Sequence, residues 1–292
     1  MLWKFPSIEI APTVIIPLFP DGNGITNTLL GTWIVIAILL AFFFFATRRR
    51  DLIPSGLQNF AEWAVESLQG LVESVAGKEK GRLFFPLVAT FFIFIFICNM
   101  IDILPVVDTI GTITKGATVV HGPFLFGNDT DRIAPWFRPP TSDINLTLSM
   151  AIVSVVTTQF FGFSILGAWR QLGRYFQFQA FKKGPLGTID FFVGLIELVA
   201  EVMRLISFSF RLFGNIFAGS VLLAIFAYLI PFLANIIFIP LEIFVGFMQA
   251  FVFAVLTLAF MELGTTTHDH EEGETVHEAE EEFARSHAAG AH

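Results

Sequence analysis

One arginine lies in a stretch that reads as the interior of a membrane-spanning helix. Between Arg204 and Glu242 the chain runs for 37 residues in which Arg211 is the only charged residue. Arginine stays protonated at physiological pH and costs about 2.5–3.5 kcal/mol at the bilayer centre even on the insertion scale. A cation at a helix end can reach the interface along its own stem, but here apolar helix continues well beyond Arg211. We therefore interpret Arg211 as a functional intramembrane charge, the usual meaning of such residues.

Other polar residues share the Arg211 face of the same predicted helix. With 3.6 residues per turn, the residues of this stripe fall within about 80° of one another. They are Glu197, Glu201, Arg204, Arg211 and Asn215. Glu201 and Arg204 are three residues apart, so a simple mutual neutralisation also explains that pair. Ser220 follows Arg211 by nine residues and falls on the opposite face.

The next predicted helix carries Glu242 and Gln249, which are seven residues apart and share a face. Removing a lone carboxylate from water disfavours its charged form, which suits Glu242 to carry a proton. Asn99 and Asp102 form a further polar group at the end of a predicted span.

Asp143 and Asn145 form a second polar group at the end of a span. The sequence of residues 141–145, TSDIN, is typical of a helix N-terminus with Ser142 or Asp143 as its cap. A place at the mouth of a channel explains the same residues equally well.

The elements that position these residues are predicted to be membrane helices. The composition is 54% apolar and 14% charged, far from the balance of a soluble domain. Uncharged windows long enough to cross about 30 Å of hydrocarbon recur along the chain, and helices are the default at that depth. We predict an all-α integral membrane protein with five membrane-embedded helices and one interfacial amphipathic helix. The predicted spans are about 25–47, 83–103, 144–169, 187–230 and 232–263, within a membrane domain of residues 25–264.

The last two spans are longer than a perpendicular crossing requires. We interpret them as an antiparallel hairpin of long, steeply tilted helices separated at Pro231. Pro240 marks either a kink in the second helix or its true start.

Residues 55–77 are predicted to form the interfacial helix. Apolar residues recur there at steps of three and four, at Leu57, Phe60, Ala64, Leu68, Leu71 and Val75. Acidic residues and glutamines take other positions, and Gly77 supplies a stop. A soluble-type surface helix is the alternative, but a place between two spans favours the membrane interface.

Lysine and arginine placement predicts the orientation. Eleven of these residues lie on one side of the predicted spans and four on the other, which places the first set in the cytoplasm. The N-terminal arm, residues 1–24, is then outside and shows no signal-peptide pattern. The tail, residues 265–292, is inside. It carries eight acidic residues and one basic residue, which together account for −7 of the chain's net charge of −8. We interpret the tail as disordered and solvated, with weak metal binding by its histidines as the alternative.

Several classes of function are excluded by absent motifs. The chain has no phosphate-binding glycine loop, dinucleotide fingerprint, nucleophile elbow or HExxH motif, so catalytic chemistry of its own is not indicated. No cofactor or resident metal is implied. A single cysteine, Cys98, excludes an intrachain disulfide, and the acidic charge argues against nucleic acid.

Four segments resemble subunit a of the F-type ATP synthase in order and spacing. They are residues 207–219 (SFSFRLFGNIFAG), 249–257 (QAFVFAVLT), 99–105 (NMIDILP) and 143–150 (DINLTLSM). The resemblance covers about residues 25–263. It implies a stator subunit beside a rotating c-subunit ring, with the peripheral-stalk b subunits and the rest of the ATP synthase as partners, in a bacterial plasma membrane.

The resemblance also assigns roles to residues. Arg211 is implied to be the essential arginine facing the carboxylates of the c-ring, and Glu197 to lie on the cytoplasmic path. Asn215, Glu242 and Gln249 are implied to line or border the external path. Ser207, Asn99, Asp102, Asp143 and Asn145 are further candidates from the matching segments. Many family members carry an acid or histidine at the position of Ser220. Because serine has no titratable group, Glu242 alone is expected to carry the external proton in this chain.

Three functions remain open from the sequence. The first is a proton-translocating stator with two offset half-channels, and a sodium-translocating version differs from it only in the ion. The second is a self-contained ion carrier or channel that uses the same charges. A purely scaffolding subunit leaves Arg211 and Glu242 unexplained.

Overall fold

The structure is a computed structural model that describes residues 12–17, 24–48, 56–103, 111–113, 133–167, 185–229 and 231–265. Most of the predicted N-terminal arm, and the predicted tail beyond Thr265, lie outside these residues. The chain divides into two compact units. The first comprises Met1–Val156 and Val199–Ala259, and the second comprises Thr157–Leu198 and Phe260–His292.

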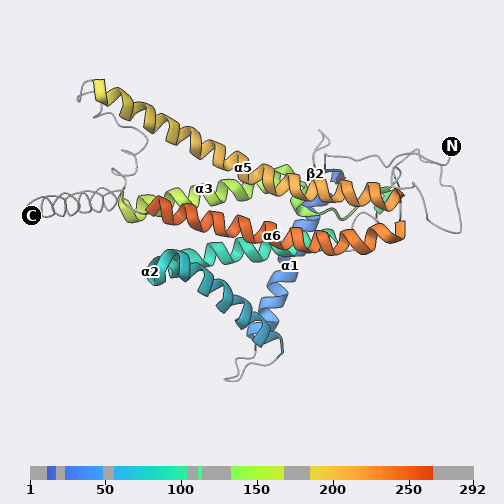
Figure 1. The fold of residues 1–292 in the computed structure, drawn as a ribbon. Coiled ribbons are helices and arrows are strands. Elements are labelled where there is room, and N and C mark those ends of the chain that lie inside the picture. The colour runs from blue at the N-terminus through green and yellow to red at the C-terminus, as the bar shows by residue number, and fades with distance from the viewer. Residues whose placement is uncertain are drawn as a thin grey trace, which may run out of the picture. The chain divides into compact units, whose positions relative to one another are not determined.

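Long helices make up most of the described chain (Figure 1). They are α1 (Asn27–Thr47), α2 (Leu57–Asp102), α3 (Ile144–Leu166), α5 (Pro185–Leu229) and α6 (Pro231–Thr265). Four of them, α1, α2, α3 and α6, are long and apolar enough to cross a membrane. The predicted class, an all-α integral membrane protein, agrees with this content, whereas the count of five spans and the tilted hairpin stay predictions.

Helix boundaries follow local sequence signals. Thr26 precedes α1 in an extended conformation, and its hydroxyl accepts a hydrogen bond from the Leu29 backbone N–H at 3.3 Å, as an N-cap does. Helix α6 begins at Pro231 and continues through Pro240. Of the two roles considered for Pro240, the start of the helix is therefore wrong.

Helix α2 contains the predicted interfacial segment and the following span, and it changes direction between them (Figure 1). The break is at Gly77, where φ is 73° and ψ is 172°. A positive φ of this kind strongly favours glycine, so the predicted stop at Gly77 is confirmed.

The buried face of the first half of α2 differs from the predicted one. Its buried residues are Ala61, Leu68, Val72 and Ala76, and only Leu68 was in the predicted apolar set. Leu57 and Phe60 are more than half exposed. At the surface, Phe60 meets Phe42 of α1 edge-on at 6.2 Å between ring centroids.

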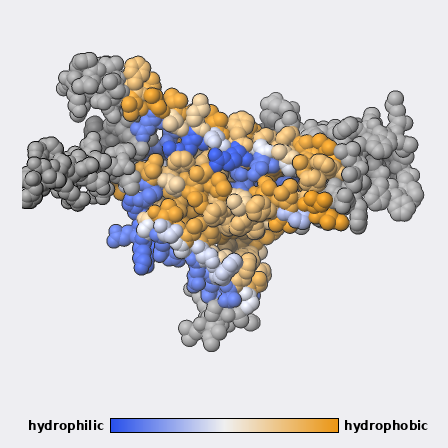
Figure 2. All heavy atoms as spheres, viewed as in Figure 1, coloured by the Kyte–Doolittle hydropathy of each residue, from blue (hydrophilic) through white to orange (hydrophobic). Residues whose placement is uncertain are grey.

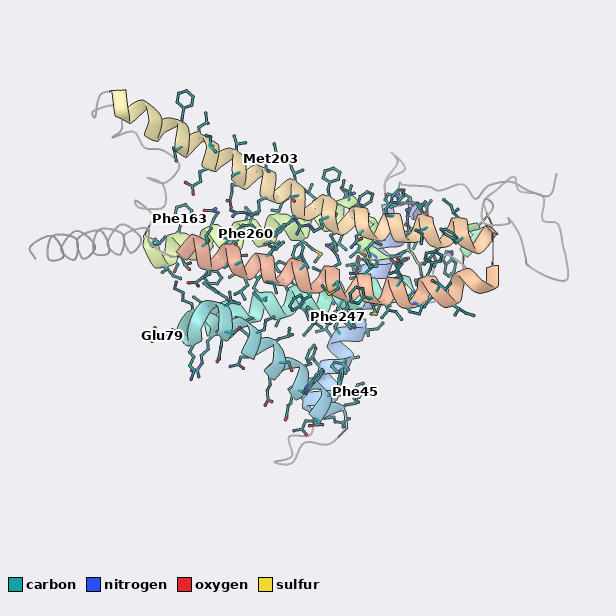
Figure 3. The ribbon with its side chains drawn as sticks, in the orientation of Figure 1. Phe45, Glu79, Phe163, Met203, Phe247 and Phe260 are labelled. Atoms are coloured by element: carbon teal, nitrogen blue, oxygen red, sulfur yellow. The ribbon has the colours of Figure 1, made fainter. Side chains whose placement is uncertain are left out.

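Figure 2 shows hydrophilic residues gathered along the first half of α2, whereas the visible surface over α6 is largely hydrophobic. Exposed apolar residues occur at successive positions of α6, among them Leu241, Phe244 and Phe247. Phe247 lies on the side of α6 beside α2 (Figure 3), with its ring 5.8 Å from that of Phe92. Such surfaces suit a bilayer, because lipid tails are as apolar as the side chains.

Two short antiparallel hairpins accompany the helices, and the sequence interpretation did not anticipate them. β1 (Val14–Pro17) pairs with β2 (Gly24–Thr26), which leads directly into α1. β3 (Gly111–Ile113) pairs with β4 (Ile133–Pro135). A short 3-10 helix, η2 (Pro140–Ser142), precedes α3.

Candidate functional site

Polar residues predicted from separate segments meet where the end of α2 approaches α5 and α6. We call Asn99, Asp102, Ser220 and Glu242 the α2-end cluster. The Asn99 amide donates to the Gly246 carbonyl oxygen of α6 at 3.0 Å, and Asn99 is only 1% exposed. The Ser220 hydroxyl of α5 lies 3.4 Å from a carboxylate oxygen of Asp102 and 3.0 Å from the Ile216 carbonyl oxygen. The sequence placed these residues on three helices, and the fold brings them to one place.

Glu242 is 6% exposed, and its carboxylate lies directly against Gly219 of α5. A Cβ at Gly219 would overlap the carboxylate, with the carboxyl carbon only 2.6 Å away. Oxygen Oε1 accepts no hydrogen bond from the described residues. A buried charged carboxylate without such bonds is costly, and protonation removes that cost.

Asn215 and Gln249 connect α5 to α6 within the first unit. The Asn215 side-chain amide donates to the Gln249 amide oxygen at 3.1 Å. Gln249 is 5% exposed, and its Nε2 has no hydrogen-bond partner among the described residues. A buried amide with an unused donor can be satisfied by an ordered water.

Arg211 is exposed on the surface of α5. Its neighbours along the chain include the exposed residues Ile206, Ser207 and Phe210, whereas Leu212 and Ile216 are buried. No ion pair to Arg211 is formed within the part of the chain that the structure describes.

The rest of the predicted stripe along α5 is divided by the structure. Glu201 and Arg204 form an ion pair at 2.8 Å, so their mutual neutralisation is confirmed. Glu197 lies on α5 in the second unit and is half-buried. Ser207 is exposed.

Asp143 acts as the N-cap of α3. One carboxylate oxygen accepts from the Asn145 backbone N–H at 2.9 Å, and the other accepts from the Thr28 hydroxyl of α1 at 2.8 Å. Asp143 is 9% exposed, whereas the Asn145 side chain is exposed. The cap predicted from TSDIN is therefore confirmed at Asp143, and the carboxylate also fastens α1 to α3.

Sequence reasoning missed several contacts in this region. It did not single out Gly219 beneath Glu242, Thr28 on Asp143, or the hydroxyl pairs that join α3 to α5 and α6 (Thr147 with Ser209, and Ser154 with Thr257). Isolated small residues in an apolar helix carry no spacing signal of their own. Only the rotation of each helix reveals which of them face a neighbour.

The sequence matches the family described as ATP synthase A chain over residues 29–262. ATP synthase subunit a of Moorella thermoacetica is 32% identical over 246 residues, which cover 84% of this chain and 93% of the relative. The subunit a of Trichlorobacter lovleyi is 31% identical, covering 87% of this chain and 94% of that protein. That of Campylobacter jejuni subsp. doylei is 32% identical, covering 80% and 86%. With a family match across the α1 to α6 region and relatives of similar length, this chain belongs to the ATP synthase subunit a family.

Proposed function

We propose that this chain is the proton-translocating stator subunit of a bacterial rotary ATP synthase. The observation that carries the proposal is Arg211, an exposed permanent cation of α5 with no ion pair among the described residues. The partner that fits is a ring of c subunits, each presenting a carboxylate. The b subunits of the peripheral stalk and the rest of the ATP synthase hold the chain beside that ring.

The external half-channel is proposed to run through the polar contacts between α2, α5 and α6. Its residues are Asn99, Asp102, Asn215, Ser220, Glu242 and Gln249. Support comes from the hydrogen bonds of Asn99, Ser220 and Asn215 across these helices and from the burial of Glu242. Asp143 and Asn145 belong to its mouth in this proposal, with Asp143 serving mainly to hold the helices there.

The cytoplasmic half-channel is proposed to include Glu197 and Ser207. Glu201 and Arg204 lie on the same helix face, and their ion pair neutralises both charges. Glu201 is then not available to pair with Arg211, and Arg204 does not attract the carboxylate that Arg211 binds. In this proposal the N-terminus is outside and the C-terminus is in the cytoplasm, the orientation predicted from the placement of lysine and arginine.

The mechanism follows from the fixed charge of Arg211. A proton reaches a ring carboxylate from the external half-channel and neutralises it, and a neutral carboxyl can rotate into lipid. After almost a full turn the proton leaves through the cytoplasmic half-channel. Arg211 favours the ionised carboxylate as it passes and prevents a direct proton shortcut. Each proton contributes about 2.3 kcal/mol per 100 mV, so closing this shortcut is what allows the gradient to drive ATP synthesis.

The test is ATP-driven proton pumping in inverted vesicles that contain the complete ATP synthase with Arg211→Ala. We expect pumping to be abolished while the subunit remains in the assembled complex. Arg82→Ala is the control, because it removes an exposed arginine of α2 that the proposal places outside both half-channels. A sodium-free buffer tests proton specificity in the same vesicles. Normal pumping by Arg211→Ala would refute the proposed role.

A self-contained carrier or channel is the competing function. It predicts transport by the purified chain reconstituted alone, whereas the stator requires the c-ring to co-purify with it. Transport without a ring would replace the proposal.

A further inference from the structure

Two buried pairs of hydroxyl groups join α3 to the helices that carry the polar path. Thr147 of α3 lies 3.3 Å from Ser209 of α5, measured between the side-chain oxygens. Ser154, seven residues further along α3, lies 2.9 Å from Thr257 of α6. None of these four residues is more than 2% exposed.

The direction of the Thr147–Ser209 hydrogen bond follows from counting hydroxyl protons. Thr147 has one such proton and lies 3.1 Å from the Ile144 carbonyl oxygen, to which it donates. Ser209 therefore donates to Thr147. In the second pair, Thr257 lies 2.9 Å from the Phe253 carbonyl oxygen, to which it also donates. Both pairs are hydrogen bonds between helices.

Ser209 precedes Arg211 by two residues, which is about 200° of rotation around a helix axis. A rotation of α5 that places Ser209 against α3 therefore points Arg211 away from α3. The burial pattern agrees, because Phe208, Ser209 and Leu212 are buried whereas Phe210 and Arg211 are exposed.

Apolar packing alone specifies such a rotation poorly within a membrane. Lipid tails are as apolar as phenylalanine, so turning an apolar side chain from protein to lipid changes its solvation little. A hydroxyl turned into hydrocarbon loses its hydrogen bond, which makes that rotation unfavourable. Two described residues of α5 near Arg211 form hydrogen bonds to another helix, Ser209 and Asn215. Ser209 is the nearer of the two to Arg211 in the sequence.

We infer that the Thr147–Ser209 hydroxyl pair is a positioning device that holds the rotation of α5 and so aims Arg211 at its partner. Thr147 and Ser209 are positioning residues, since neither touches the proposed ring carboxylate. The inference rests on the proposed function of Arg211 and adds to it two residues outside the proton path.

The experiment measures two quantities in inverted vesicles that contain the complete ATP synthase. The first is the ratio of protons pumped to ATP hydrolysed, and the second is the passive proton permeability after the catalytic head is removed. Ser209→Ala and Thr147→Val each remove the bond with little change in volume, and Thr147→Ser retains the hydroxyl.

We expect Ser209→Ala and Thr147→Val each to lower the ratio about threefold and to raise the passive permeability. A threefold change corresponds to about 0.6 kcal/mol, the average for hydrogen bonds between membrane helices. The double variant should be no worse than either single variant, because both remove the same bond. Thr147→Ser should keep the ratio of the unmodified protein.

Ser154→Ala is the matched control, because it removes an equally buried hydroxyl bond from the same helix α3. It should lower resistance to unfolding as Ser209→Ala does, without changing the pumping ratio. An equal loss of the ratio in both variants would show that the Thr147–Ser209 pair is merely structural and would overturn the inference. So would equal ratios for Thr147→Val and Thr147→Ser.

The Arg211→Ala variant separates this inference from the proposed function. Pumping by Arg211→Ala would overturn the proposed function itself. Loss of pumping by Arg211→Ala with an unchanged ratio in Ser209→Ala would overturn the positioning role alone.

Discussion

Replacement of Gly219 by alanine should disable the proposed external path by moving one carboxylate. In the structure the Glu242 carboxyl carbon lies 2.6 Å from the position that an alanine Cβ would take. Two carbon atoms in van der Waals contact are about 3.5–4.0 Å apart. The Glu242 carboxylate must therefore move by about 1 Å, or the two helices must separate by a similar distance.

A displacement of this size has two expected effects. Misplacement of a reacting group by about 1 Å can cost about 100-fold in rate, so we expect ATP-driven proton pumping to fall by about 10- to 100-fold. Overpacking of a buried site destabilises by about 1–3 kcal/mol. That amount is consistent with a subunit that still inserts and assembles, so the loss of pumping can be measured in assembled complexes.

The assay is proton pumping per assembled complex in inverted vesicles. Gly70→Ala is the matched control, because it makes the same substitution in a helix at a position where an added Cβ meets nothing within 4 Å. There alanine should be neutral or slightly stabilising. Glu242→Asp retracts the carboxylate by one C–C bond, about 1.5 Å, so the double variant Gly219→Ala/Glu242→Asp should pump better than Gly219→Ala alone. Normal pumping by Gly219→Ala, or no improvement in the double variant, would refute this reasoning.

Two further predictions concern individual carboxylates. Glu242→Gln keeps the shape of the side chain but removes its titratable proton, so pumping should be strongly reduced, whereas Glu66→Gln on the exposed face of α2 should pump normally; equal pumping by both would remove Glu242 from the path. Asp143→Ala deletes the α3 cap, which contributes about 1 kcal/mol, and removes the hydrogen bond from the buried Thr28 hydroxyl to a charged carboxylate, which contributes about 1.5–3 kcal/mol. Unfolding in mixed detergent micelles should therefore show a loss of about 2–4 kcal/mol for Asp143→Ala and almost none for Ser149→Ala, and an unchanged midpoint for Asp143→Ala would contradict its capping role.

The helices were largely predictable because their signals are local. Uncharged windows of about 20 residues define where a helix can lie in hydrocarbon, and α1, α3 and α6 match the predicted spans to within a few residues. Gly77 and Asp143 were identified from the residue types that end and begin helices. The two short hairpins were missed, since β1 and β3 are only three or four residues long and carry no clear alternating pattern.

The candidate site was predictable as a set of residues and not as a set of contacts. Arg211 and Glu242 were identifiable because placing a charged residue in the bilayer is unfavourable whichever way its helix is rotated. Their surroundings were not: Gly219 beneath the Glu242 carboxylate and Ser209 against Thr147 became visible only in the assembled helices. The buried face of the first half of α2 was misplaced for a related reason. Ala61, Leu68, Val72 and Ala76 pack inward, while Leu57 and Phe60 remain at the surface.

The sequence by itself determined the class of protein, the approximate spans and the charges that transport would use, because transfer of each residue into hydrocarbon depends mainly on that residue. Only the tertiary structure decided which polar groups meet, with Asn215 on Gln249, Ser220 near Asp102 and Thr28 on Asp143. Those contacts depend on the rotation and relative height of each helix. In a bilayer an apolar pattern specifies neither, because lipid and protein interior solvate an apolar side chain almost equally.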